Sequence, residues 1–256
     1  MPSDKRIQSV ANASRLLLEL AAVNGPIRLN DLSARLGMNK SSVHLLLSTL
    51  ADAGFVEQTA DATYRLGLAL FEVGTAALQQ YGLGARLAPP MEALAEQTRE
   101  AVTLGVLHQD DVLLVQRFES DQVLRASIRV GSRMPLHSSA SGRAILAFLP
   151  EDERRRRLTA TGIGAVTTRQ VLARMQEIRD AGYETQQDEW AVEVSSIAVP
   201  VFGLSGAPVA ALSVSSPSVR FAPDGWVAPL VATGEQLTIL IQQMSMTRAH
   251  LARIAP

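Results

Sequence analysis

The chain has 256 residues, a length that favours two domains, and 47% of them are hydrophobic and 19% charged. This composition predicts a folded protein, and the absence of cysteine excludes disulfides, thiolate metal sites and cysteine nucleophiles. A formal net charge of −1 leaves a nucleic-acid partner open, and no apolar run approaches the roughly 18 residues that span a membrane, so we expect a cytoplasmic protein with no membrane partner.

The first expected helix begins near Ile7. Apolar residues recur from there at the spacing of an amphipathic helix, in which side chains three and four residues apart share a face. The sequence "NGP" at 24–26 ends this helix. We expect its buried face to consist of Ile7, Val10, Leu17, Leu18 and Ala21.

Two further helices follow closely. In "RLNDLSARLG", Asn30 is the expected N-cap of a short second helix and Gly37 is its stop. Asn39 then caps a third helix, which runs to about Ala53 and ends at Gly54. Two short helices joined by a tight glycine turn predict a helix-turn-helix.

A strand pattern replaces the helical pattern after the third helix. The segments "FVEQ" (55–58) and "TYRL" (63–66) alternate apolar and polar residues across the polar turn "TADA". Three helices followed by a two-stranded hairpin predict a winged helix-turn-helix, whose third helix lies in the major groove of DNA.

The third helix separates its side chains into two faces at 100° per residue. Val43, Leu46, Leu47 and Leu50 form the expected core face. Leu45 points the opposite way and is expected either to contact a thymine methyl group or to leave the adjoining base pair unread. Lysine and arginine side chains suit phosphates, and serine and histidine suit base edges or backbone oxygens. The expected DNA-binding residues are Lys40, Ser41, Ser42, His44, Leu45, Ser48 and, on the wing, Arg65.

The connector after the wing reads as an apolar helix, "LGLALFEVGTAALQQYG". A helix this apolar needs a partner, either on its own chain or on a symmetry-related copy. We therefore expect a DNA-binding domain at 1–67, a linker helix at 68–82 and a second domain at 83–256.

The second domain mixes helices and strands. A helix begins or breaks at Pro89 and Pro90. The expected strands are 102–108, 112–119, 123–130, 195–203 and 207–217, and the expected later helices are 141–150, 151–158, 170–182 and 223–246. Strands on both sides of helices predict an α+β fold with a mostly antiparallel sheet flanked by helices.

Four segments carry a family resemblance by their order and spacing. They are "KSSVHLLLSTLADAGFVEQ" with "YRLG", then "GSRMPLHSSASGRAILAFLP", "IRDAGYETQQDEW" and "SSIAVPVFGLSGAPVAALSVSSP". With these segments, the chain resembles IclR-type transcriptional regulators over nearly its full length. The resemblance implies a GAF-like effector domain from about residue 83, which binds a small organic acid, and a homodimer or dimer of dimers on palindromic promoter DNA, with no cofactor.

The same resemblance points to an effector site between the sheet and the start of the "SGRAILA" helix. A helix N-terminus there favours a carboxylate. Two positions depart from the family pattern: Gln186 stands where some relatives have an acid, and Ser196 where some have cysteine. Leu45 also stands where relatives commonly have arginine. The effector residues implied by the resemblance are Met134, Ala140, Ser141, Gln186, Ser196, Ser213 and Ser215.

Two other functions remain open from the residues alone. One is a small-molecule enzyme with an N-terminal dimerisation domain, in which His137, the serines beside it and the acids Asp188 and Glu189 act together. No "GxSxG" elbow is present, so we assign no catalytic residue. The four histidines lack metal-ligand spacing, so we expect no metal. The second open function is a DNA-binding oligomer that binds no effector.

We interpret the arginine run 154–157 as a solvated helix face.

Overall fold

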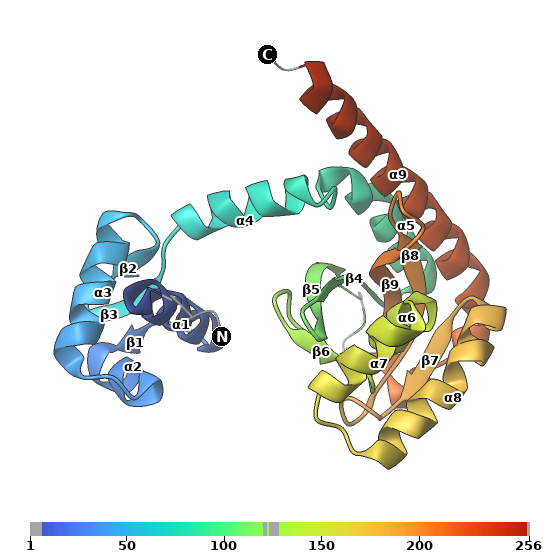
Figure 1. Cartoon of the computed structure of the whole chain (residues 1–256), viewed down its shortest axis with the longest axis horizontal. Coiled ribbons are helices and arrows are strands. Elements are labelled where there is room, and N and C mark those ends of the chain that lie inside the picture. Colours follow the sequence, from blue (N-terminus) through green and yellow to red (C-terminus); the bar gives the residue numbers. More distant parts are fainter. Residues whose placement is uncertain (1–6, 120–121, 123–127, 255–256) are drawn as a thin grey trace. The chain divides into compact units, whose positions relative to one another are not determined.

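The computed structural model describes residues 7–119, 122 and 128–254 (Figure 1). It divides into two compact units, Met1–Tyr81 and Gly82–Pro256, and each is treated by itself. None of the helices in the described ranges combines the length and apolar character needed to cross a membrane.

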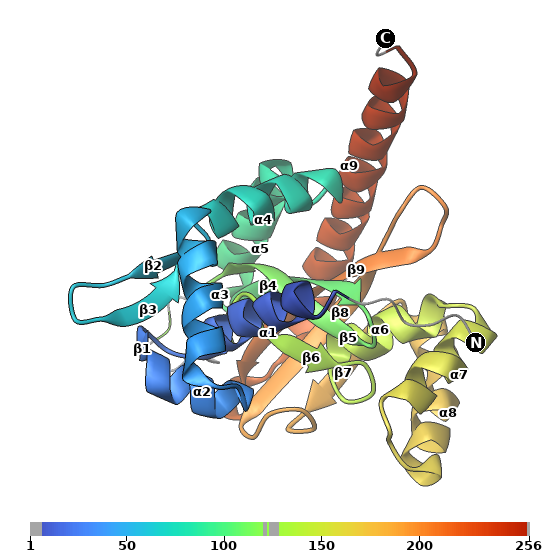
Figure 2. The same ribbon diagram turned by 60° about the vertical axis from the view of Figure 1, so that its left-hand side comes forward.

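The first unit is a helical domain with a small antiparallel sheet in the order β1-β3-β2. The hairpin of β2 and β3 forms the wing beside α3 (Figure 2). The predicted winged helix-turn-helix is confirmed, and β1 is an addition too short to show a strand period. The elements are α1 Gln8–Ala22, β1 Ile27–Arg28, α2 Leu29–Leu36, α3 Lys40–Asp52, β2 Val56–Gln58, β3 Thr63–Leu66 and α4 Ala69–Gln80.

The buried face of α1 differs from the prediction. Leu16 and Leu20 are buried, whereas Ile7, Val10 and Leu18 are exposed. The run of three leucines at 16–18 supports more than one apolar stripe at helical spacing. Packing against α2 and β3 selects the stripe that contains Leu16. The predicted face was wrong at Ile7, Val10 and Leu18, whereas Leu17 packs partly buried against the core as predicted.

The two predicted asparagine caps have different outcomes. The side-chain oxygen of Asn39 accepts a hydrogen bond from the Ser42 N–H at 2.8 Å, so the N-cap of α3 is confirmed. Asn30 is not a cap, because α2 begins at Leu29, one residue before Asn30, and Arg28 occupies the cap position without a side-chain hydrogen bond. Strand β1, which pairs with β3, runs directly into α2, and the β1–β3 pairing sets the start of the helix. Gly37 ends α2 with φ +64°, as predicted.

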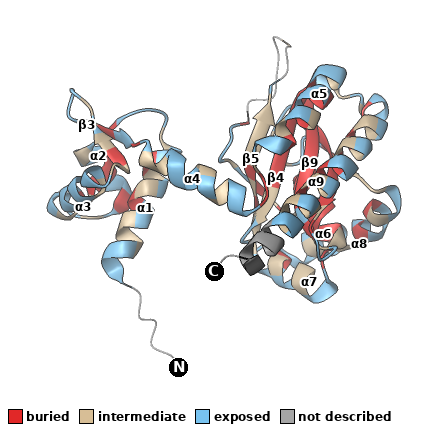
Figure 3. Cartoon of the chain, turned by 90° about the horizontal axis from the view of Figure 1, so that it is seen from above, coloured by how far each residue is buried: buried red, intermediate tan, exposed pale blue. Residues whose placement is uncertain are grey.

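Helix α4 leaves its apolar side chains uncovered. It contributes no buried residue, and Figure 3 shows it without buried positions. Leu68, at its N-cap, is 76% exposed and Phe71 is 74% exposed. Nothing in the described part of the chain supplies the partner that this helix needs.

The second unit is built on a six-stranded sheet in which neighbouring strands are antiparallel, in the order β6-β5-β4-β9-β8-β7. The predicted α+β class is confirmed. The elements are η1 Ala85–Leu87, α5 Ala88–Thr98, β4 Ala101–His108, β5 Asp111–Phe118, β6 Arg133–Pro135, α6 Ala140–Phe148, α7 Glu151–Ala160, α8 Ala165–Ala181, β7 Glu184–Gln187, β8 Val194–Phe202, β9 Pro208–Pro217, η2 Ser218–Arg220, η3 Pro223–Gly225 and α9 Val227–Ile254.

The four central strands β4, β5, β8 and β9 match predicted strands. The two edge strands β6 and β7 were not predicted, because three and four residues are too few to show alternation. The strand predicted at 123–130 lies mostly outside the described residues, and its described end at 128–130 is not a strand.

Helices cover both faces of this sheet. On one face α9 packs against β8 so closely that a Cβ on Gly234 would lie 2.6 Å from the Val199 side chain. On the other face Ala140 and Ala144 of α6 pack against Ala198 of β8. Successive strand residues point to opposite faces, so the register assigns every sheet residue to the α9 face or the α6 face.

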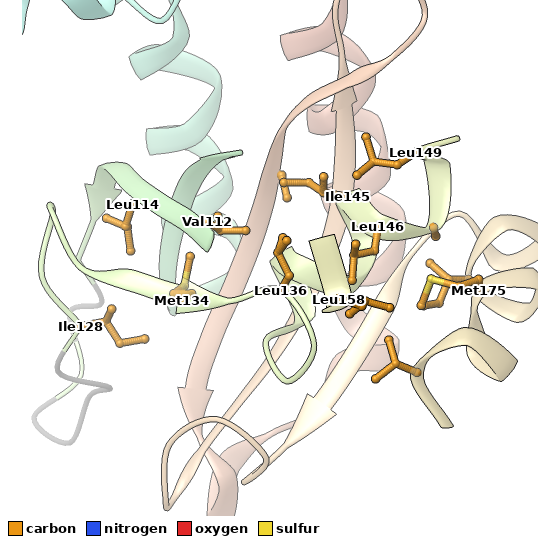
Figure 4. Packing of buried hydrophobic residues seen from close by; sticks show 14 residues of the cluster. Val112, Leu114, Ile128, Met134, Leu136, Ile145, Leu146, Leu149, Leu158 and Met175 are labelled. Carbon is orange, nitrogen blue, oxygen red and sulfur yellow. The ribbon is translucent and has the colours of Figure 1, made fainter. Parts of the chain in front are cut away.

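A large apolar cluster supports α6. Figure 4 shows Val112 and Leu114 of β5 and Met134 of β6 on one side of this cluster, with Ile145 and Leu146 of α6 beside them. Leu158 of α7 and Met175 of α8 close the other side. Strands β5 and β6 and helices α7 and α8 therefore fix α6 in place.

The arginine run on α7 is only partly a solvated face. Arg155 and Arg157 pair with Glu151 and Glu153 at i,i+4 spacing, as predicted. Arg154 instead donates to the carbonyl oxygens of Leu146, Ala147 and Leu149, which end α6. The prediction was wrong for Arg154, which satisfies backbone acceptors that an α-helix leaves open.

Candidate nucleic-acid interface and effector site

Helix α3 presents one apolar face to the core and one face to solvent. Val43 and Leu47 are fully buried, and Leu46 and Leu50 pack partly buried on the same core. Leu45 is 69% exposed on the other side. The solvent face contains Lys40, Ser41, His44, Leu45, Ser48 and Thr49, with Ser42 half-buried beside them.

Few cations in this unit are free to meet phosphate. Arg15 donates to the Leu36 carbonyl and Arg35 pairs with Glu19. Within the described residues of this unit, Arg28 and Lys40 are exposed and their side chains have no hydrogen bond or ion pair. Arg28 was missed by the sequence analysis; a basic residue directly before a helix of the motif was the available signal.

Arg65 is exposed on the wing but already paired. Its Nη2 lies 2.7 Å from Glu57 Oε2 and its Nε lies 2.9 Å from the same oxygen, across the β2–β3 hairpin. Exposed pairs of this kind contribute only about 0–1 kcal/mol, so a phosphate can exchange with the carboxylate.

The register brings the predicted polar effector residues together on the α6 face of the sheet. Gln186 of β7 pairs with Ser196 of β8, and Ser196 pairs with Ser215 of β9. Ser213 pairs with Ala198, the residue that contacts Ala140 of α6. Residues of three strands and the first turn of α6 therefore adjoin one another.

The apolar side of this site is set by Met134. It is buried in the cluster around α6, and a Cβ on Gly105 would lie 3.1 Å from the Met134 Cε. Gly105 pairs with Ala211, two residues before Ser213 on the same face. Met134 thus lies next to the polar residues. A separate open groove of about 700 Å³ between α7 and α8 contains none of the predicted effector residues.

Several polar groups of the site retain an unused hydrogen-bond donor. The Gln186 side-chain nitrogen donates to Ser196 Oγ at 3.1 Å, which leaves the Ser196 proton free to donate. Ser213 and Thr103 share one bond of 2.6 Å, so one of their two protons is free. Thr103 was missed by the sequence analysis, although a polar residue in the apolar strand "VTLGVLH" was a usable signal.

The first turn of α6 adds backbone donors. Ser139 caps the helix by accepting from the Gly142 N–H at 3.0 Å. The N–H groups of Ala140 and Ser141 precede the first intrahelical bond and have no intrahelical partner. Gly142 allows this turn to approach the preceding loop, since a Cβ there would lie 2.5 Å from the Leu136 Cα.

The residues of the enzyme hypothesis do not form a nucleophile and base. Ser139 is occupied as a helix cap and donates to the Pro135 carbonyl at 2.7 Å. Burial, and then the positive charge of Arg143, lowers the pKa of His137. Among the described residues, no hydrogen bond joins His137 Nδ1 to a serine, and no group of three His, Asp or Glu could hold a metal ion.

A winged helix-turn-helix with one face of α3 exposed, joined to an α+β domain, is the arrangement of a DNA-binding transcriptional regulator. The chain belongs to the IclR family: residues 9–60 match the IclR helix-turn-helix domain, and residues 75–238 match the bacterial transcriptional regulator IclR C-terminal domain.

Individual relatives agree with this family. The chain is 34% identical to the HTH-type transcriptional regulator KdgR of Dickeya chrysanthemi over 232 residues, which cover 86% of this chain and 75% of KdgR. It is 34% identical to the glycerol operon regulatory protein of Streptomyces griseus, covering 90% and 92%. The crystal structure of an IclR homolog from Microbacterium hydrocarbonoxydans complexed with 4-hydroxybenzoate has a TM-score of 0.79 at 23% identity, covering 91% and 98%. KdgR and the glycerol operon regulatory protein are regulators, and the chain is a DNA-binding regulator rather than an enzyme.

Proposed function

We propose that this regulator binds a palindromic operator as a homo-oligomer and responds to a small organic acid. The observation that carries the effector part is the group of unused hydrogen-bond donors on the α6 face of the sheet. These donors are the hydroxyl groups of Thr103, Ser196 and Ser213 and the N–H groups at the start of α6 that have no intrahelical partner. A carboxylate supplies acceptors for such donors, and a helix N-terminus favours its negative charge.

The DNA-binding part of the proposal assigns separate roles to the exposed residues. Lys40 and Arg28 contact phosphates, because they are the exposed cations of the first unit whose side chains have no partner among its described residues. Ser41, His44 and Ser48 read base edges from the solvent face of α3, and Leu45 contacts a thymine methyl. Arg65 leaves Glu57 to contact the flanking backbone.

The exposed apolar face of α4 supports the homo-oligomer. Leu68 and Phe71, three residues apart on one side of the helix, expose more than half of their surface, and burial of such side chains stabilises a dimer at roughly 25 cal/mol per Å² of apolar surface. A twofold dimer presents two copies of α3 to two half-sites, which accounts for a palindromic operator. We propose a dimer, or a dimer of dimers.

The proposed mechanism is a population shift. The acid binds the DNA-competent and DNA-incompetent arrangements with unequal affinity, so its binding changes the operator affinity by the same coupling free energy. A ligand with equal affinity for both arrangements changes nothing.

The effector class is tested by a thermal-shift screen of the purified protein. The screen uses 4-hydroxybenzoate, the ligand of the Microbacterium homolog, with other aromatic acids and short metabolic carboxylates. Ligand binding raises Tm to an extent set by the ratio of ligand concentration to Kd. We expect at least one acid to raise Tm in the wild type and to lose this effect in Ser213→Ala. If no carboxylate raises Tm, the protein is a DNA-binding oligomer without an acid effector.

A further inference from the structure

Arg143 is a buried cation whose hydrogen-bonding capacity is fully used. Its side chain is 2% exposed. Nε donates to Glu184 at 2.7 Å, and Nη1 donates to Glu189 at 2.6 Å and to the His137 carbonyl at 3.2 Å. Nη2 donates to Glu189 at 2.9 Å and to the Thr185 carbonyl at 3.3 Å. A guanidinium has five N–H groups, so Arg143 has none left for a ligand.

These bonds join three segments that surround the proposed effector site. His137 lies in the loop that enters α6, three residues before Ala140. Thr185 of β7 directly precedes Gln186. Glu189 follows β7, and its N–H donates to the Gln186 side-chain oxygen at 3.0 Å. One guanidinium therefore fixes both the first turn of α6 and the strand that carries Gln186.

The charge of Arg143 is compensated within the same network. Glu184 also pairs with Arg174 of α8 at 2.9 Å, so two arginines meet the two carboxylates Glu184 and Glu189. The network has no formal excess charge to offer an anion. Its contribution to an effector site is consequently geometric.

We infer that Arg143 is the positioning residue of the proposed effector site: it holds the start of α6 against β7 at the separation a carboxylate needs, without touching the ligand. This inference rests on the proposed effector function. A planar guanidinium suits this positioning, because its five N–H groups bond two carboxylates and two carbonyls. The ammonium group of a lysine donates at most three hydrogen bonds.

Two variants separate positioning from charge. Arg143→Lys keeps the positive charge and loses the planar guanidinium with its five N–H donors. Glu189→Gln removes one negative charge and weakens the bidentate pair. If Arg143 acted through its charge, Arg143→Lys would bind a carboxylate as the wild type does, and Glu189→Gln would bind it more tightly. Positioning predicts weaker binding in both variants, by roughly tenfold or more.

Arg174→Gln is the matched control. It removes a half-exposed partner of Glu184 and leaves every bond of Arg143 in place. We expect it to bind 4-hydroxybenzoate, or the best acid of the screen, with wild-type affinity within about twofold.

Hydrogen–deuterium exchange gives a readout that needs no ligand. In full-length Arg143→Lys and Glu189→Gln we expect the amides of 137–143 and 185–190 to exchange roughly tenfold faster, with β4 and β9 unchanged. Uniformly faster exchange would indicate a general loss of stability and would overturn the inference, as would wild-type exchange or wild-type affinity in both variants. If no acid binds the wild type, the proposed effector class fails, and the exchange of 137–143 still decides whether Arg143 holds these segments.

Discussion

Leu45 is the residue at which the proposed DNA-binding surface of α3 departs most clearly from a cationic one. It is 69% exposed between polar neighbours on α3. Leu45→Arg adds a cation where a groove-facing side chain can reach phosphate. We expect tighter binding to operator and non-operator DNA alike, and a log Kd against log salt slope steeper by about one.

Fluorescence anisotropy at several salt concentrations measures this slope. Leu45→Gln is the control, because it adds a polar side chain without charge and should leave the slope unchanged. A Leu45→Arg variant with the wild-type affinity and slope would show that this position does not face DNA.

The two asparagines near the turn provide a matched test of helix capping. Asn39→Ala removes the side-chain acceptor of the Ser42 N–H, and loss of an N-cap costs about 1 kcal/mol of unfolding free energy. Asn30→Ala changes an exposed residue that caps nothing, so we expect a change within about 0.5 kcal/mol. Urea unfolding of both variants measures the difference; equal effects would contradict the cap assignment.

His137 connects stability to pH. Burial, and secondly the Arg143 charge, lowers its pKa in the folded state below the usual 6.5, so the unfolded chain binds the proton more tightly. The unfolding free energy contributed by His137 is therefore full above pH 6.5 and decreases as the pH falls toward the folded-state pKa.

His137→Gln should reduce the loss of unfolding free energy between about pH 7.5 and about pH 5.5, a range that brackets the usual histidine pKa. Urea titrations at both pH values measure this, with His108→Gln as the control because His108 is exposed at the end of β4. The same pH slope in wild type and His137→Gln would refute the assignment.

At the scale of elements, α4 makes the most direct prediction. Phe71→Glu places a charge on an apolar face that we propose is buried between copies, and burial of an unpaired charge is costly. We expect the dimer to dissociate at concentrations at which wild type is dimeric, measured by sedimentation velocity. Ala76→Glu adds the same charge at an exposed position roughly 140° around α4 from Phe71 and should keep the dimer. A Phe71→Glu dimer as stable as wild type would exclude this face.

The elements that the sequence predicts are those with enough residues to show a period. Helices α3, α6 and α8 and the hairpin of β8 and β9 follow from spacing and from glycine or asparagine signals. The edge strands β6 and β7 depend on pairing with the longer strands β5 and β8, and a short strand carries little signal of its own. Asn30 has the same residue type as Asn39, and only the β1 pairing shows that it is not a cap.

Less of the candidate effector site than of the helices and strands could be predicted from the sequence. The register places Gln186, Ser196, Ser213 and Ser215 on adjoining strands, but their selection came from family resemblance rather than from spacing. The bonds of Arg143 to Glu184 and Glu189 join residues more than 40 positions apart and leave no local pattern. Long-range contacts of this kind require the fold.

At the scale of the whole molecule, we propose that one chain couples an acid-binding site to DNA reading. The two proposed binding sites lie in different units, which divide near Tyr81. Coupling is reciprocal: an acid that weakens operator binding is itself bound more weakly by the DNA complex. This reciprocity distinguishes an effector from a compound that only stabilises the second unit.

The most direct measurement is an anisotropy titration of the protein on DNA from upstream of its own gene. It is made at moderate salt, with and without a saturating acid from the screen, and against a scrambled sequence of the same composition. We predict selective binding of the upstream DNA and a change in its Kd of about 5- to 150-fold on adding the acid, absent in Ser213→Ala. Equal affinity for both DNAs, or a Kd that a bound acid leaves unchanged, would contradict the account.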